Sequence, residues 1–304
     1  MKIRLNPIVK KDLQVTVRSM RMSWGLFAYE AALTIAFLLA LVFIQDAASY
    51  SYSDNIYSYL IYLFPAVAVT QVCIVALYVP IITASSISGE KERQTFDIML
   101  TTCMSPFAIV FGKVISAVFR ILFFVIASTP IMALSFVVGG LSWSYLFYYL
   151  LAVILFSVFA GSIGIFASSI CRKSVSALLL SFVMYFVIFA LTFVPLIYRA
   201  MTYRYGEDYY GESMLLLLWN PVVFFEEFFA QIMAGESIFG RLGDSLGKKE
   251  LGILTYALAR GKVWMFTSAG CIMLLSFLFM ALAAWKVNPM HSGSGRTRKK
   301  KRAE

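Results

Sequence analysis

The chain alternates long apolar runs with short polar breaks. A helix of about 20 apolar residues spans a hydrocarbon core of about 30 Å, and six runs reach that length. They lie at residues 25–45, 60–87, 107–138, 145–170, 174–198 and 263–285. The pattern predicts an all-α integral membrane protein with six transmembrane helices.

The third run is longer than the hydrocarbon core requires. We therefore expect its first turns to stand in the membrane interface, where the long side chains of Lys113 and Arg120 reach water. Pro130 is expected to kink the other half of this helix. In the fourth run Ala160, Gly164 and Ser168 repeat every fourth residue, which favours close approach of another helix.

The polar segments complete the predicted domain organisation. Residues 1–24 form a basic leader, interpreted as an amphipathic helix that lies on the membrane surface. Residues 25–287 form the transmembrane domain, and residues 288–304 form a basic tail that we expect to be disordered. Lys and Arg gather in the leader, the loop after the second run, the Arg172–Lys173 turn and the tail, whereas the loops at 46–59 and 139–144 contain neither. This bias predicts cytoplasmic N- and C-termini in a multi-pass cell-membrane protein.

The long segment at 199–262 is predicted to be an extracellular helical insertion. Asn220 before Pro221 is a typical helix start, an Asn cap with Pro at the first helical position. The helix that follows carries four phenylalanines on one side: Phe224, Phe225, Phe228 and Phe229. Two roles remain open for them, insertion into the outer leaflet or packing against the spans.

The segment after the second run packs five charges into an otherwise apolar chain. It is predicted to form an amphipathic helix at 89–103, with Phe96, Met99, Leu100 and Cys103 on one side. Two interpretations are open: an ordinary hydrated loop, or a lever on the membrane surface that a soluble partner grips. The charges are Glu90, Lys91, Glu92, Arg93 and Asp97.

Composition excludes several classes of protein. With 61% hydrophobic and 14% charged residues and a mean hydropathy of +0.81, the chain has too little polar surface for a soluble globule. The net charge of +10 gathers at segment ends rather than on a basic face, which argues against nucleic-acid binding. The four cysteines lack metal-ligand spacing, and the single histidine lies in the tail.

No catalytic, cofactor or metal site is predicted. GRLGDSLGKKE, starting at Gly240, lacks the spacing and the Ser or Thr of a nucleotide-binding loop. Glu226 and Glu227 are neighbours on a helix, so they point in different directions and do not form an acid–base pair. The second, fourth, fifth and sixth runs contain no Asp, Glu, Lys, Arg or His, which argues against ion-coupled transport. We therefore expect a non-enzymatic protein driven by a separate motor.

The stretch SGEKERQTFDIMLTTCMSPFAIVFGK at 88–113 resembles the segment after the second span in ABC type-2 exporter permeases. Gln94, Phe96 and Cys103 depart from the usual Gly, Leu and Pro of that pattern. The six-span plan, the leader, the Asn-Pro helix and the tail are similar to this family as well. The matching positions are Glu90, Lys91, Glu92, Arg93, Thr95, Asp97, Leu100, Ser105, Gly112 and Lys113.

The resemblance implies a permease subunit of an ATP-driven exporter, paired with a second permease subunit, identical or related. It also implies two separate ABC ATPase subunits that hydrolyse ATP, and a cap at the outer end of the path made from Asn220, Pro221 and the four phenylalanines. The alternative is a membrane anchor or sensor that recruits a cytoplasmic regulator; a channel or secondary carrier is a third possibility. The implied ATPase-coupling residues are Glu90, Lys91, Glu92, Arg93, Thr95, Phe96, Asp97 and Leu100.

Overall fold

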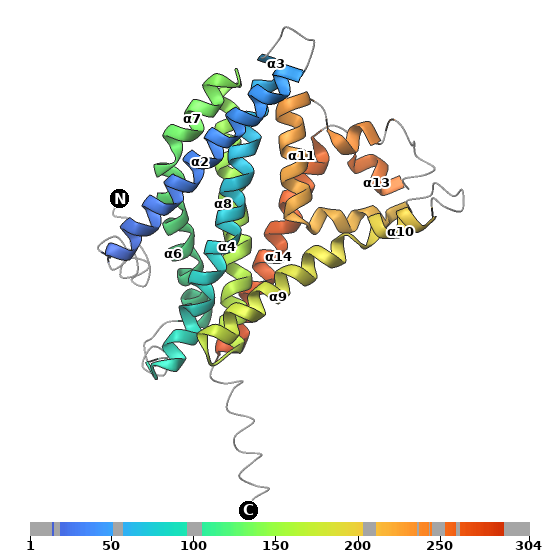
Figure 1. Cartoon of the computed structure of the whole chain (residues 1–304). Coiled ribbons are helices and arrows are strands. Elements are labelled where there is room, and N and C mark those ends of the chain that lie inside the picture. Colours follow the sequence, from blue (N-terminus) through green and yellow to red (C-terminus); the bar gives the residue numbers. More distant parts are fainter. Residues whose placement is uncertain are drawn as a thin grey trace, which may run out of the picture.

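Six helices in the described part of the chain are long and apolar enough to cross a membrane, which confirms the predicted number of spans (Figure 1). No strand occurs among the described residues. The helices are α2 (Met20–Tyr50), α4 (Leu63–Glu92), α6 (Pro106–Ala127), α8 (Trp143–Ile170), α9 (Ser174–Thr192) and α14 (Val263–Val287). The computed structural model describes residues 14, 19–50, 57–95, 105–202, 211–235, 237–242, 244, 253–259 and 262–288.

The two chain ends lie largely outside the described residues. The predicted leader helix at 1–24 is described only at residue 14 and from residue 19, and α2 begins at Met20 rather than at the predicted residue 25. A short helix, α3 (Tyr57–Leu60), precedes α4. The predicted tail is described only at Asn288, so its disorder stays a prediction.

α8 is the central helix and packs against α4, α6, α9 and α14. Its approach to α4 is close at Gly164, where an added Cβ would come within 2.0 Å of Thr83 Oγ1. One turn later, Ser168 Oγ accepts hydrogen bonds from the backbone N–H groups of Ile87 at 2.9 Å and Ser88 at 2.8 Å. The predicted face of small residues is therefore confirmed at Gly164 and Ser168, because both let backbones meet.

Two predicted spans are each divided into two helices. The run at 107–138 breaks at Ser128 into α6 and α7 (Thr129–Val138). Pro130 explains the break, because proline lacks an N–H and clashes with the carbonyl four residues earlier. The run at 174–198 breaks at Phe193 into α9 and α10 (Val194–Thr202), which has Pro195 at its second position.

A buried polar cluster joins four segments in the middle of the bundle. Gln71 of α4 donates to Tyr29 Oη of α2 at 2.8 Å and to Ser128 Oγ at 3.1 Å. Tyr149 Oη of α8 donates to Gln71 Oε1 at 3.1 Å. Because the Gln71 amide satisfies groups on three other segments, it fixes their relative positions in an apolar core.

The segment between α10 and α14 folds back against the spans. It contains η2 (Gly211–Trp219), α11 (Pro221–Ala234) and α13 (Ile253–Leu258). Residues 213–219 and 221–233 together are long and apolar enough to count as a span, but they are bent by 88°. Figure 1 shows α11 standing beside α14, at the far end of the bundle from the start of α9. The predicted extracellular insertion is therefore partly a component of the helical bundle.

Four spans, α4, α6, α8 and α14, come together at one end of the bundle. Ile87 near the end of α4, Val110 in the first turns of α6, Ile165 near the end of α8 and Val287 at the end of α14 belong to one buried cluster. At the other end, Trp264 at the start of α14 packs among residues of η2 and α11. We call the first the charged end, since it holds Glu90, Lys91 and Glu92 of α4.

Candidate functional site

The charged residues after the second span complete α4 instead of starting a new helix. α4 continues past the predicted end at residue 87 and ends at Glu92. Gln94 then has a φ of 58°, a left-handed conformation that stops an α-helix. The predicted helix at 89–103 is therefore not continuous, because its first residues belong to the span and Gln94 separates them from the rest.

Two of the other predicted coupling residues lie on the turn after α4, and three lie outside the residues that the structure describes. Arg93 and Thr95 are exposed on the turn. Phe96, Asp97 and Leu100 lie outside the described residues, so the apolar face of the predicted helix stays a prediction.

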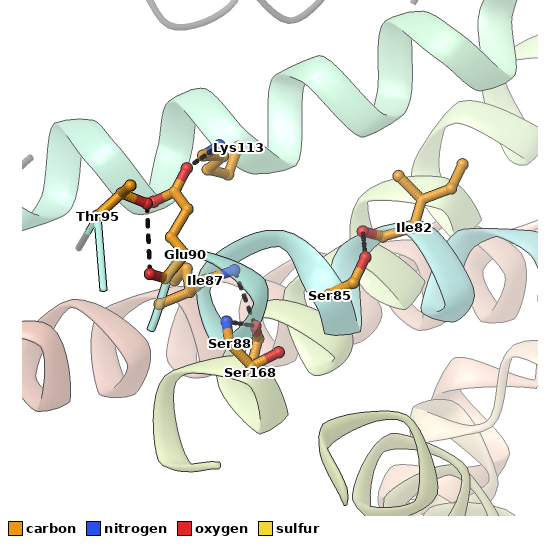
Figure 2. A network of polar contacts seen from close by, with 8 residues as sticks. All are labelled: Ile82, Ser85, Ile87, Ser88, Glu90, Thr95, Lys113 and Ser168. Carbon is orange, nitrogen blue, oxygen red and sulfur yellow. Dashed lines mark hydrogen bonds and ion pairs between the residues drawn. The ribbon is translucent and has the colours of Figure 1, made fainter. Parts of the chain in front are cut away.

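Glu90 joins α4 to α6. Its carboxylate forms an ion pair with Lys113 Nζ at 2.9 Å, as Figure 2 shows. The Lys113 side chain is only 9% exposed, so the prediction that it reaches water at the interface is wrong. A cation taken out of water needs an opposite charge, and Glu90, 23 residues earlier, supplies it.

Lys91 joins α4 to the end of α8. Its ammonium group donates to the backbone carbonyls of Ser169 and of Cys171, the latter at 3.4 Å. The last carbonyls of a helix have no partner within the helix and carry partial negative charge, so a lysine is favourable there.

Glu92 joins α4 to the start of α9. Its two carboxylate oxygens accept hydrogen bonds from Ser174 Oγ at 2.7 Å and from the Ser174 backbone N–H at 3.2 Å. The first N–H groups of a helix are unpaired and carry partial positive charge, which a carboxylate stabilises. Glu92 thus acts as a capping residue for α9 supplied by another helix.

Three consecutive residues of α4 therefore contact three different spans. A further hydrogen bond joins the turn to the end of α4, because Thr95 Oγ1 donates to the Glu90 carbonyl at 3.3 Å (Figure 2). The turn at Arg93 thus directly follows three residues that contact α6, α8 and α9. Sequence reasoning singled out the charges but missed Ser169 and Ser174, since a serine at a helix end gives no signal of a distant partner.

The second candidate site is the helix that follows Asn220. Asn220 Oδ1 accepts the Val222 N–H at 2.9 Å, and its Nδ2 donates to Thr192 Oγ1 of α9 at 2.8 Å. Pro221 is the first residue of α11. These contacts confirm the predicted helix start and show that the same asparagine holds α11 against α9.

The four phenylalanines of α11 pack against the protein itself. Phe225 makes an edge-to-face contact with Phe156 of α8 at a centroid distance of 5.7 Å, and Phe229 makes one with Phe64 of α4 at 6.3 Å. Phe224 and Phe228 are also buried. Of the two roles left open for this face, the structure shows packing against the spans.

Two neighbouring glutamates of α11 have opposite environments. Glu226 is exposed, whereas Glu227 is fully buried and accepts hydrogen bonds from Gln231 Nε2 at 3.1 Å and the Ile238 N–H at 3.0 Å. They point apart, as helix geometry predicts, so they do not form an acid–base pair. Among the described residues no cluster of His, Cys, Asp and Glu has the geometry to hold a metal ion.

A large apolar cavity lies between α4, α8, α9 and α11. Its volume is about 790 Å³. Val72, Phe189 and Phe225 contribute apolar walls, while Glu226 and Arg241 contribute charges. Mostly apolar walls with a few polar groups are typical of sites for small organic ligands.

The comparisons with known proteins agree with this architecture. The curated proteins contain no match to this sequence. The sequence profile of a family described as "ABC-2 family transporter protein" matches residues 39–285, which runs from the last part of α2 through α4 to nearly the end of α14. The chain therefore belongs to the ABC-2 family of transporter permeases, as a multi-pass membrane protein.

Proposed function

We propose that this permease is the membrane-spanning subunit of an ATP-driven exporter. It works with separate ABC ATPase subunits and pairs with a second six-span permease subunit, identical or related. The charged end faces the cytoplasm, so both chain termini are cytoplasmic. Lys and Arg in the leader, the loop after α4, the Arg172–Lys173 turn and the tail support this orientation.

The observation that carries the proposal is the set of contacts made by Glu90, Lys91 and Glu92. A loop that only connected two spans would not need to pair each charge with a different helix. Here the turn at Arg93 is joined through polar contacts to α6, α8 and α9. An ATPase that moves the turn and residues 96–104 therefore moves three spans.

The exposed side chains of Arg93 and Thr95 form the described part of the docking surface. Closure of two ATPases around ATP pushes on this surface and on the leader, and the spans rock. A route then opens between the two permease subunits. The apolar cavity beside α4, α9 and α11 lies on this route, and α11 covers its outer part.

Charge reversal at the turn tests the docking role. The full-length chain is purified from its native membrane in mild detergent, and the bound ATPase subunits and their hydrolysis of ATP are measured. Arg93→Glu should lower the amount of bound ATPase several-fold at low salt and less at high salt, because exposed charges are screened. Lys262→Glu, which reverses another exposed cation at the other end of the bundle, is the control and should have no effect.

Equal ATPase binding by both variants would contradict the docking role. A complex purified without any ATPase would favour the alternative of an anchor or sensor. Orientation is tested separately in a cysteine-free variant with single cysteines at positions 93 and 262. An impermeant maleimide added to intact cells should label position 262 and spare position 93; the opposite pattern would refute the orientation.

A further inference from the structure

A small polar cavity lies between α4 and α6, within the membrane-spanning part of the bundle. Its volume is about 160 Å³, roughly ten times the 10–15 Å³ that one water molecule requires. The surrounding spans are apolar, so a polar cavity here needs an explanation. The polar lining residues are Thr83, Ser85, Ser86, Lys113, Ser116 and Arg120.

The two cations of this cavity come from one face of α6. Lys113 and Arg120 are seven residues apart, which is two helical turns. Arg120 follows Pro106 by 14 residues, so it lies about 21 Å along the helix from its start. An arginine at such depth costs roughly 2.5–3.5 kcal/mol on insertion scales. Charges of this kind face a cavity or a pathway rather than lipid.

Among the residues that the structure describes, the charge of the cavity is only partly compensated. Glu90 is paired with Lys113 at 2.9 Å. The Arg120 Nε atom is buried and has no hydrogen-bond partner among the described residues. A buried donor without a partner costs about 1–3 kcal/mol, so the cavity is positively charged and holds at least one donor that a ligand would satisfy.

The hydroxyl groups narrow the choice of ligand. Thr83 Oγ1 donates to the Val79 carbonyl at 2.8 Å, and Ser85 Oγ donates to the Ile82 carbonyl at 3.1 Å (Figure 2). The protons of these two hydroxyl groups are thus already used, whereas the Arg120 Nε–H on the same cavity wall remains available to a ligand. A planar guanidinium binds two oxygens of a phosphate or carboxylate side by side, and a lysine beside it adds a point charge.

We propose that the α4–α6 cavity is a binding site for a phosphate group, with Arg120 as its bidentate ligand and Lys113, which keeps its ion pair with Glu90, as the second cation. A phosphate offers oxygens to both cations at once, whereas a carboxylate would be satisfied by Arg120 alone. The phosphate comes from a membrane phospholipid headgroup or from a soluble phosphate ion. The inference stands on the cavity and does not depend on the ATPase partner.

Binding is measured on the delipidated full-length chain by native mass spectrometry. One arm titrates phosphatidylglycerol in a nonionic detergent, and the other titrates inorganic phosphate. Arg120→Gln should weaken binding of the preferred phosphate at least tenfold, whereas Arg120→Lys should weaken it less, because the charge is kept. The control is Arg172→Gln, which removes an exposed cation at the same end of the bundle and should not change binding.

A second variant tests the cavity independently, in case Arg120→Gln does not fold. Ser86→Leu fills the cavity while both cations remain, and it should also weaken binding at least tenfold. Loss of phosphatidylglycerol binding alone identifies a lipid site, and loss of inorganic phosphate binding alone identifies a soluble-ion site. The proposal is overturned if neither phosphate binds the unaltered chain, or if Arg120→Gln and Ser86→Leu bind both as the unaltered chain does.

Discussion

The contact between Gly164 and Thr83 gives the sharpest test of the packing at the centre of the bundle. In Gly164→Ala the new Cβ would come within 2.0 Å of Thr83 Oγ1 and 3.0 Å of Thr83 Cβ. Thr83 cannot turn away easily, because it is β-branched and its hydroxyl is held by the Val79 carbonyl. The helices α4 and α8 must therefore separate or distort.

The magnitude follows from two opposing effects. Overpacking of a tight core costs about 1–3 kcal/mol, and an overlap of this size belongs at the upper end. Alanine is a better helix former than glycine by about 1 kcal/mol. The expected net loss is thus about 2 kcal/mol of unfolding free energy, which lowers the thermal midpoint by several degrees.

The assay is thermal unfolding of the purified chain in detergent, followed by tryptophan fluorescence. Thr83→Ala removes the clashing oxygen, so the double variant Gly164→Ala/Thr83→Ala should recover most of the stability that Gly164→Ala loses. Thr83→Val keeps a heavy atom in the same place and should not rescue. The packing argument is refuted if Gly164→Ala leaves the midpoint unchanged, or if Thr83→Val rescues as well as Thr83→Ala.

Two further predictions concern buried polar groups. Gln71→Leu leaves the hydroxyl groups of Tyr29 and Ser128 without the amide that joins them, and it should cost about 1–2 kcal/mol; Leu179→Ala, on the exposed face of α9, is the control and should shift the unfolding midpoint less. Glu90→Gln leaves Lys113 without its carboxylate in a partly buried site, so the double variant Glu90→Gln/Lys113→Met should unfold at a higher temperature than Glu90→Gln alone. A double variant less stable than both single variants would contradict the pairing.

The sequence predicted helix starts and helix breaks correctly where both partners of the interaction lie in the same short segment. Asn220 caps α11 through the Val222 N–H only two residues away, and Pro130 breaks the third span close to its own position. These effects depend on neighbouring backbone atoms, so residue type and order are sufficient to predict them.

Only part of the candidate site was predictable, because its interactions join segments that are far apart in the sequence. The charges from Glu90 to Arg93 were visible as a polar break, but the partners of Lys91 and Glu92 lie 78 and 82 residues further along the chain. The burial of Lys113 was missed for the same cause, since a lysine near a helix end is equally compatible with the interface. Hydropathy does not distinguish a lysine whose ammonium group reaches water from a lysine that forms a buried ion pair with a carboxylate.

The sequence by itself determined that this chain forms six helices long and apolar enough to cross a membrane, because a long apolar helix satisfies its own backbone groups in hydrocarbon. Only the tertiary structure decided which faces of those helices meet and where the polar side chains between them gather. Lipid tails are as apolar as leucine, so hydrophobicity does not choose one helix partner over another. Shape at Gly164 and polar pairing at Gln71, Glu90 and Glu92 made that choice, and both depend on residues brought together from distant parts of the chain.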